Sequence, residues 1–172
     1  MRLNDGEVVS LLGPSGCGKT TLLKLASGIE KLQKGEIKLN DKIISSSNTH
    51  LSPDKRKVGY VFQDCALFPH LTILQNIFFG MNSKEISAQT NKIQNLMNEI
   101  NISRLSDSFP HELSGGQQQQ VALVRAIASD PKIILLDEPY SNLDSRLKEK
   151  IRDQMLHILR EHNISALLVT HD

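Results

Sequence analysis

Short, mostly apolar runs recur along the chain between segments of helical character. Three of them occupy residues 7–12, 132–136 and 164–170, and each is bounded by polar or turn-forming residues. Runs of this length and composition are typical of strands that a parallel sheet buries on both faces. Residues 56–62 are predicted to form a further strand.

Apolar residues at helical spacing fill much of the remaining chain. Residues 87–100 and 146–161 each repeat them at steps of three or four, which forms one apolar helix face. A shorter helix is predicted to begin after Thr72, whose hydroxyl can cap it. The stripe in 87–100 can face the core or a partner protein, and we favour the core because large exposed apolar patches are uncommon.

A hairpin and a helical insertion complete the pattern. Residues 34–44 alternate apolar and charged positions around an Asn-Asp turn signal at 40–41, as a β-hairpin does. From 63 to 113 the periodicity is helical, apart from a linker at 101–110. Strands that alternate with helices predict an α/β fold with a mostly parallel sheet and helices on its faces.

Composition adds limits rather than a function. The chain has 172 residues, 39% hydrophobic and 23% charged, which suits one globular domain. Its net charge of +1 gives no basic surface for nucleic acid. No apolar run reaches the roughly 18 residues of a spanning helix, and no signal peptide is visible, so we expect a protein that docks on a membrane without crossing it. Cys17 and Cys65 lack metal-ligand spacing, which favours a reduced compartment.

The strongest chemical signal is the loop GPSGCGKT at 13–20, between a predicted strand and a predicted helix. It fits the pattern G-x-x-x-x-G-K-[ST], whose backbone N–H groups cradle phosphates at a helix N-terminus. Its lysine can reach the β- and γ-phosphates, and its threonine hydroxyl suits Mg²⁺. A chance glycine-rich turn is disfavoured by the flanking elements. The predicted phosphate-binding residues are Gly13, Pro14, Ser15, Gly16, Cys17, Gly18, Lys19, Thr20 and Thr21.

Polar residues end two of the predicted strands. Asp137 and Glu138 follow the run 132–136, and ligands bind at the carboxyl ends of strands in open α/β sheets. We expect Asp137 to help hold Mg²⁺ and Glu138 to orient an attacking water; the alternative is a solvent-facing acidic pair, which the phosphate loop disfavours. His171 ends the last strand and is a candidate to sense the γ-phosphate, although a lone histidine is usually structural.

A second helix start also suits phosphate. At 114–117, a serine and two glycines stand at the start of a predicted helix. Such a helix N-terminus attracts anions. By itself this pattern is weak, and a plain capped helix start is the favoured explanation of it.

Taken together, these motifs resemble the nucleotide-binding domain of ABC transporters. Six motifs of that family occur here in the family's order and over nearly the whole chain. They are the Walker A loop at 13–20, the Q-loop at Gln63, the signature at 113–117, Walker B at 133–139 with its catalytic glutamate Glu138, the D-loop at 141–144 and the switch histidine His171. The resemblance implies a P-loop NTPase core with a helical subdomain at about 70–116, in one partial domain over 1–172.

The resemblance also implies a mechanism. Two such domains would stack head to tail, as a homodimer, and sandwich two ATP molecules with Mg²⁺. Thr20, Gln63 and Asp137 would contact the metal, and Gln63 would also relay the nucleotide state to permease subunits. The residues that would contact the nucleotide from the signature and the D-loop are Ser114, Gly115, Gly116, Gln117 and Asp144.

A finer resemblance concerns transport. Residues 13–18, 66–72 and 114–119 look like importers of the iron(III), polyamine and quaternary-amine type. This implies an ATPase on the cytoplasmic face of the membrane, bound to permease subunits and served indirectly by a solute-binding protein. Two alternatives stay open: a non-transport ABC ATPase of DNA repair or translation, and a truncated remnant without catalysis.

Three features depart from the family. Gln120 replaces the usual arginine after the signature. The aromatic residue that stacks on adenine lies upstream of Walker A, and this chain begins only twelve residues before Gly13. The chain also stops at Asp172, directly after His171. We therefore expect a domain truncated at both ends, with weaker ATP affinity than a complete one.

Overall fold

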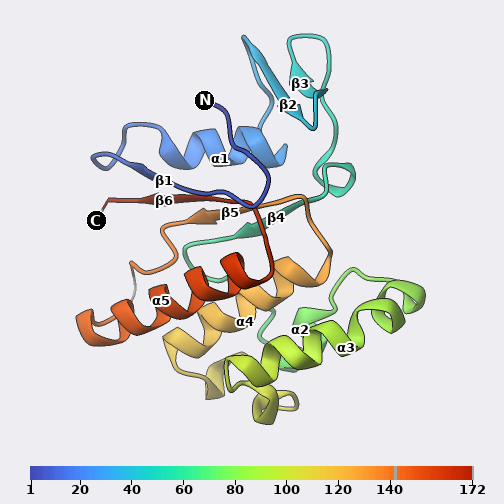
Figure 1. The fold of residues 1–172 in the computed structure, drawn as a ribbon, viewed down its shortest axis with the longest axis vertical. Coiled ribbons are helices and arrows are strands. Elements are labelled where there is room, and N and C mark those ends of the chain that lie inside the picture. Colours follow the sequence, from blue (N-terminus) through green and yellow to red (C-terminus); the bar gives the residue numbers. More distant parts are fainter. Residues whose placement is uncertain (142, 172) are drawn as a thin grey trace.

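A parallel sheet organises the fold in the computed structural model (Figure 1), which describes residues 1–141 and 143–171. Its four strands lie in the order β1-β6-β5-β4, and all neighbours pair in parallel. The strands are β1 Val8–Leu12, β4 Val58–Val61, β5 Ile133–Asp137 and β6 Ala166–Thr170. The predicted α/β fold with a mostly parallel sheet is confirmed.

Helices cover both faces of this sheet. Figure 1 shows α1 (Lys19–Ser27) on one face, and α4 (Gly115–Ala128) and α5 (Ser145–Glu161) on the other. The helices α2 (Ile73–Ile77) and α3 (Ser83–Glu99) pack against α4. Among the described residues, no helix combines the length and apolar character that crossing a membrane requires.

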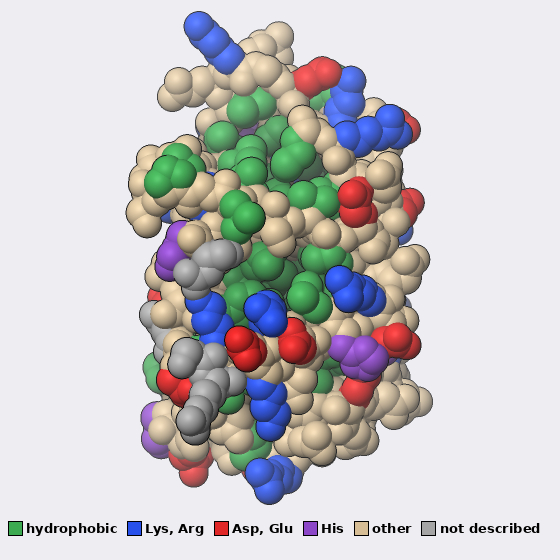
Figure 2. All heavy atoms as spheres, turned by 60° about the vertical axis from the view of Figure 1, so that its left-hand side comes forward, with side chains coloured by type: hydrophobic (Ala, Val, Ile, Leu, Met, Phe, Trp, Pro, Cys, Tyr) green, Lys and Arg blue, Asp and Glu red, His purple; other side chains and the backbone are tan. Residues whose placement is uncertain are grey.

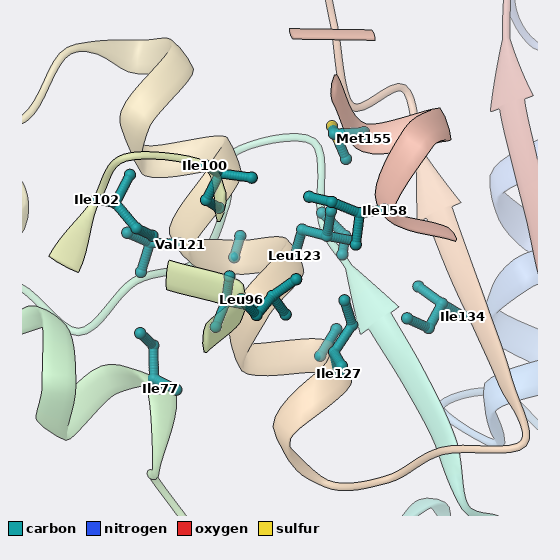
Figure 3. Packing of buried hydrophobic residues seen from close by; sticks show 14 of the residues in the cluster. Ile77, Leu96, Ile100, Ile102, Val121, Leu123, Ile127, Ile134, Met155 and Ile158 are labelled. Carbon is teal, nitrogen blue, oxygen red and sulfur yellow. The ribbon is translucent and has the colours of Figure 1, made fainter. Parts of the chain in front are cut away.

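The main core lies between the sheet and the lower helices. In Figure 3, Leu96 of α3, Leu123 of α4, Ile134 of β5 and Ile158 of α5 converge, and each is at most 1% exposed. Burying one such side chain contributes about 1.5–3 kcal/mol. The predicted stripe in 87–100 therefore faces the core.

A smaller apolar cluster fixes the helix that follows the phosphate loop. Leu23 of α1 is fully buried and packs with Leu135 of β5 and with Leu167 and Val169 of β6. This contact sets the position of α1 over the two central strands, and with it the position of the loop that precedes α1.

The end of α1 is also anchored. Gly28 adopts a left-handed φ of 86°, and its N–H donates to the carbonyls of Lys24 and Leu25, as a glycine that ends a helix typically does. Arg56, only 1% exposed, donates to the carbonyls of Leu25 and Ala26. A Cβ on Gly28 would clash with the Arg56 guanidinium, so this close approach also requires glycine.

The hairpin prediction is confirmed. Strands β2 (Glu36–Leu39) and β3 (Lys42–Ser46) pair antiparallel. The turn residues Asn40 and Asp41 have φ of 49° and 60°, as a two-residue hairpin turn with left-handed central residues requires.

The helical region from 63 to 113 differs from the prediction in two places. Helix α3 begins at Ser83 rather than at 87. The Asn82 side chain accepts hydrogen bonds from the N–H groups of Lys84 and Glu85, and the Glu85 carboxylate accepts one from the Asn82 N–H. This capping box starts the helix before its apolar stripe begins. The predicted linker 101–110 contains a 3₁₀ turn at Ser103–Leu105, and another begins at its end, Pro110–Glu112.

Candidate functional site

The phosphate-loop sequence lines a pocket of about 200 Å³ between β1 and α1. Gly16 and Gly18 have φ of 80° and 93°, in the left-handed region that glycine adopts without steric cost. A Cβ on either glycine would meet nothing within 4 Å, so backbone conformation rather than crowding requires glycine here. The lining residues are Ser15, Gly16, Gly18, Lys19, Thr20, Thr21 and Glu138.

Lys19 folds back over this loop. It is 7% exposed, and its Nζ donates to the carbonyl oxygens of Gly13 at 2.6 Å and Pro14 at 2.9 Å. Cys17 Sγ lies 3.7 Å from the same ammonium. These neutral acceptors hold the positive charge at the wall of the pocket without neutralising it.

Asp137 connects three elements at the carboxyl end of β5. The Thr20 hydroxyl of α1 donates to its Oδ1 at 2.9 Å, and the Tyr60 hydroxyl of β4 donates to its Oδ2 at 3.0 Å. Burial and the nearby Asp137 charge raise the pKa of Tyr60 well above its usual value, so the phenol keeps its proton. Tyr60 was not predicted from the sequence, where its only signal was a hydroxyl inside a predicted strand.

Glu138 and His171 meet at the same edge. The Glu138 carboxylate lines the pocket, and its Oε2 lies 3.2 Å from His171 Nδ1. Strand pairing explains the meeting, since the Glu138 N–H donates to the Val169 carbonyl of β6 at 3.0 Å. Glu138 has a φ of 46°, a conformation that costs a non-glycine residue on the order of 1–3 kcal/mol and clusters at functional sites.

Comparison with known proteins now decides the family. The model of the family described as "ABC transporter" matches residues 1–141. The chain belongs to the ABC transporter family. One relative is the Fe(3+) ions import ATP-binding protein FbpC 2 of Haemophilus influenzae, 49% identical over 99% of this chain and 48% of its own length. Another is the spermidine/putrescine import ATP-binding protein PotA of Pseudomonas fluorescens, 42% identical over 100% of this chain and 47% of its own length.

Further relatives and solved structures agree. The sulfate/thiosulfate import ATP-binding protein CysA of Pseudomonas syringae is 40% identical over 99% of the chain and 53% of its own length. The chain thus spans about half the length of these relatives. A dimeric ATP-binding cassette solved with ADP and Pi has a TM-score of 0.78 at 33% identity, with full coverage of this chain and 78% of that one. The cbiO1 protein of Clostridium perfringens, part of the ABC transporter complex cbiONQ, gives 0.85 at 31%, with full coverage and 70%.

The predicted Q-loop follows β4, which packs beside α4, the helix that begins at the predicted signature. Gln63 is exposed, and it is not among the lining residues that the structure describes for the pocket. Just after it, Cys65 and Ala66 have φ of 61° and 44°. Arg125 of α4 donates to both of their carbonyls at 2.7 Å, so α4 holds the segment after Gln63 by two hydrogen bonds.

The predicted signature residues 114–117 are not among the residues that the structure describes as lining the pocket. Ser114 Oγ accepts from the Gln117 N–H, and the Gln117 side chain accepts from the Ser114 N–H, which caps α4. Ser114 and Gly115 are exposed. Gly116 is buried against α5, where a Cβ would come within 3.2 Å of Leu147 and Ile151.

The D-loop likewise leads to a helix start. The Asp144 carboxylate accepts from the Leu147 N–H at 3.0 Å and caps α5. Asn142 of the predicted D-loop, like Asp172, is outside the residues that the structure describes. Asp144 and residues 114–117 are thus separate from the pocket lining that the structure describes.

The replacement of the usual arginine is accommodated inside the fold. Gln120 is 6% exposed, and its Nε2 donates to Gln154 Oε1 of α5 at 3.0 Å. A neutral pair at this α4–α5 contact avoids the desolvation of a buried charge.

The donor set of the pocket fits nucleotide phosphates and Mg²⁺. The loop offers N–H groups and a lysine, and Thr20 and Asp137 offer hard oxygens. Within residues 1–141 and 143–171, no group of three or more His, Cys, Asp or Glu side chains is arranged to hold a metal ion. Mg²⁺ commonly takes one or two protein oxygens and completes its shell with phosphates and waters, which this pair allows.

The surface around the site carries mixed charge. Figure 2 turns the left-hand side of Figure 1 forward, and acidic and basic side chains are interspersed over it, with hydrophobic side chains gathered between them. This distribution agrees with the net charge of +1.

Proposed function

We propose that this chain is the ATP-binding and ATP-hydrolysing part of an ABC importer subunit. One observation carries the proposal: the phosphate loop and Glu138 line one pocket, whose Thr20 is bonded to Asp137. Phosphoryl transfer to water needs this combination of a phosphate cradle, a metal-binding pair and a carboxylate that positions the nucleophile.

Each residue of the pocket has a role in this proposal. The loop N–H groups of 13–20, with Thr21, bind the phosphates, and Lys19 places its charge on the β- and γ-phosphates. Thr20 and Asp137 would hold Mg²⁺, which neutralises developing phosphate charge when bound, and Gln63 would approach the metal or the attacking water.

Glu138 and His171 carry the water chemistry. Glu138 accepts a hydrogen bond from the attacking water and orients it toward the γ-phosphate. His171, 3.2 Å from the carboxylate, keeps Glu138 in place and contacts the γ-phosphate.

A second copy of the domain completes each site. The signature and Asp144 are separate from the pocket of their own chain, and Ser114 and Gly115 are exposed at a helix start. A head-to-tail homodimer would bring residues 114–117 of one copy onto the γ-phosphate bound by the other. The dimeric structural neighbour with ADP and Pi supports this arrangement.

Transport follows from the relatives and from the layout of the chain. We propose one partial domain over 1–172, with a helical subdomain at about 70–116 that docks on permease subunits at the cytoplasmic face of the membrane. The similar proteins are named as iron, sulfate and polyamine import subunits, which supports an importer of the iron(III) or polyamine type, fed by a solute-binding protein.

Hydrolysis of Mg²⁺-ATP beside the variant Glu138→Gln tests the proposal. We expect the wild type to turn over and the variant to lose about a hundredfold or more of the rate, because it lacks the base that positions water. The variant should still bind ATP and form an ATP-dependent dimer in size-exclusion chromatography. Glu161→Gln, at the exposed end of α5, is the matched control and should hydrolyse normally. A wild type that neither binds ATP nor dimerises would rule the proposal out.

A further inference from the structure

We propose that Tyr60 is a positioning residue that orients Asp137 for Mg²⁺, an inference that rests on the proposed function. The Tyr60 hydroxyl donates to Asp137 Oδ2 at 3.0 Å, and the Thr20 hydroxyl donates to Oδ1 at 2.9 Å. The two carboxylate oxygens are therefore held by donors from two different elements, β4 and α1.

Two hydrogen-bond donors fix the orientation of the Asp137 carboxylate, which one donor would leave free to rotate. The terminal torsion of an aspartate is broad, so a carboxylate bonded only through Oδ1 can turn about its axis. The bond to Oδ2 sets the plane of the Asp137 carboxylate relative to Thr20. The Thr20 oxygen can then present a lone pair to Mg²⁺ while its hydrogen stays on Oδ1.

Tyr60 is itself held in place. It lies on β4 directly opposite Leu135 of β5 in the parallel pair. Leu135 is two residues before Asp137 on the same strand. The Tyr60 ring packs on Phe62 with centroids 4.3 Å apart. A phenylalanine would keep this packing and lose only the bond to Asp137.

The hydroxyl acts through Asp137 rather than on the nucleotide. Thr20, which is bonded to Asp137, is among the residues that the structure describes as lining the pocket, whereas Tyr60 is not. Removing the hydroxyl should therefore change how the site uses Mg²⁺ and leave the phosphate cradle intact. Hydrogen-bond partners of metal-ligating carboxylates typically affect metal affinity by about tenfold or more.

The test titrates Mg²⁺ against a fluorescent ATP analogue bound to wild type, Tyr60→Phe and Tyr140→Phe. The control removes the other tyrosine hydroxyl, which is buried and has no hydrogen-bond partner among the described residues. We expect the half-saturating Mg²⁺ concentration to rise by about tenfold in Tyr60→Phe alone. Binding in EDTA should be unchanged in all three proteins, and excess Mg²⁺ should restore the kcat of Tyr60→Phe.

The outcomes separate the inference from its premise. An unchanged Mg²⁺ midpoint in Tyr60→Phe overturns the role of Tyr60, and so does an equal loss of binding in EDTA, which would indicate a damaged loop. A wild type whose analogue binding ignores Mg²⁺ overturns the proposed magnesium site as well. Melting temperatures of the three proteins, measured alongside, identify a purely structural effect, which would shift stability and leave the Mg²⁺ midpoint in place.

Discussion

Two glycine-bearing helix starts, at α1 and at α4, look alike in the sequence and differ in the structure. The first residue before α1 is Gly18, which has a left-handed φ of 93° and provides no side-chain cap. The α4 helix is closed by a reciprocal capping box between Ser114 and Gln117. The N–H groups of α1 therefore face a pocket, whereas α4 satisfies part of its own N-terminus.

This difference indicates which helix start can bind phosphate within one chain and which needs a second molecule. An uncapped helix N-terminus lined by Lys19 is ready for phosphate within one chain. The capped N-terminus of α4 is separate from that pocket in the described residues, so under the proposed homodimer the phosphate that reaches it is bound by the other copy. Four substitutions, with one matched control, can break or sharpen this contrast.

The largest effect is expected at the start of α1, from Lys19→Met. The variant keeps most of the side-chain bulk and loses the charge that the pocket directs at phosphate. We expect ATP affinity to fall by about tenfold or more, since a hydrogen bond to a charged group contributes about 1.5–3 kcal/mol, and hydrolysis to fall by about a hundredfold or more.

The matched control is Lys24→Met, in the last turn of the same helix, where the ammonium lies 3.8 Å from Glu30. Equilibrium binding of a fluorescent ATP analogue should be normal in this control. Equal binding by both variants would contradict the contrast between the two helix starts.

The same alanine substitution should have opposite effects on stability at the two starts. Gly18→Ala forces a left-handed φ on a residue with a Cβ, which costs about 1–2 kcal/mol. Gly115→Ala replaces a helical glycine whose Cβ would make an ordinary 3.5 Å contact with Leu143, and should stabilise the fold by about 0.5–1 kcal/mol. Urea unfolding of both variants measures whether the free energy of unfolding falls in Gly18→Ala and rises in Gly115→Ala.

In Gly115→Ala, ATP-dependent dimerisation should weaken even though the fold becomes more stable. Under the proposed homodimer, Gly115→Ala places a methyl group where the partner's γ-phosphate approaches, so ATP-dependent dimerisation should weaken while stability rises. A variant that dimerises as the wild type does would count against residues 114–117 as the contact in trans.

The smallest effect on ATP binding is expected from Ser114→Ala. It removes the hydroxyl that accepts the Gln117 N–H, and loss of such a cap costs about 1 kcal/mol. ATP binding by the monomer should be unchanged, because Ser114 is outside the described pocket lining. Thermal unfolding and analogue binding in the same samples check both halves; weaker monomer binding would place the signature in the pocket of its own chain.

Local features of the fold were predictable because they depend on neighbours in sequence. The buried runs predicted β1, β5 and β6, and the Asn-Asp pair predicted the turn between β2 and β3. The start of α3 was wrong because the apolar stripe, on which the prediction relied, begins after the helix does. The Asn82 cap was the missed signal.

The site was predictable only in part. Motif spacing indicated the phosphate loop and the polar strand ends, which the structure brings to one edge. It did not indicate that Tyr60 meets Asp137 or that Arg125 holds Cys65 and Ala66, because these contacts cross 77, 60 and 59 residues of sequence. Such distances depend on which strands and helices become neighbours.

The sequence by itself therefore determined the elements, their caps and the chemistry of the loop, since backbone conformation and helical periodicity are set over a few residues. Only the tertiary structure decided the strand order β1-β6-β5-β4, and that order sets the two contacts of the site. It puts Glu138 beside His171 across β5 and β6, and Tyr60 beside Asp137 across β4 and β5. The physical reason is that parallel neighbours are joined through long crossovers, so their pairing follows from the packing of the whole core.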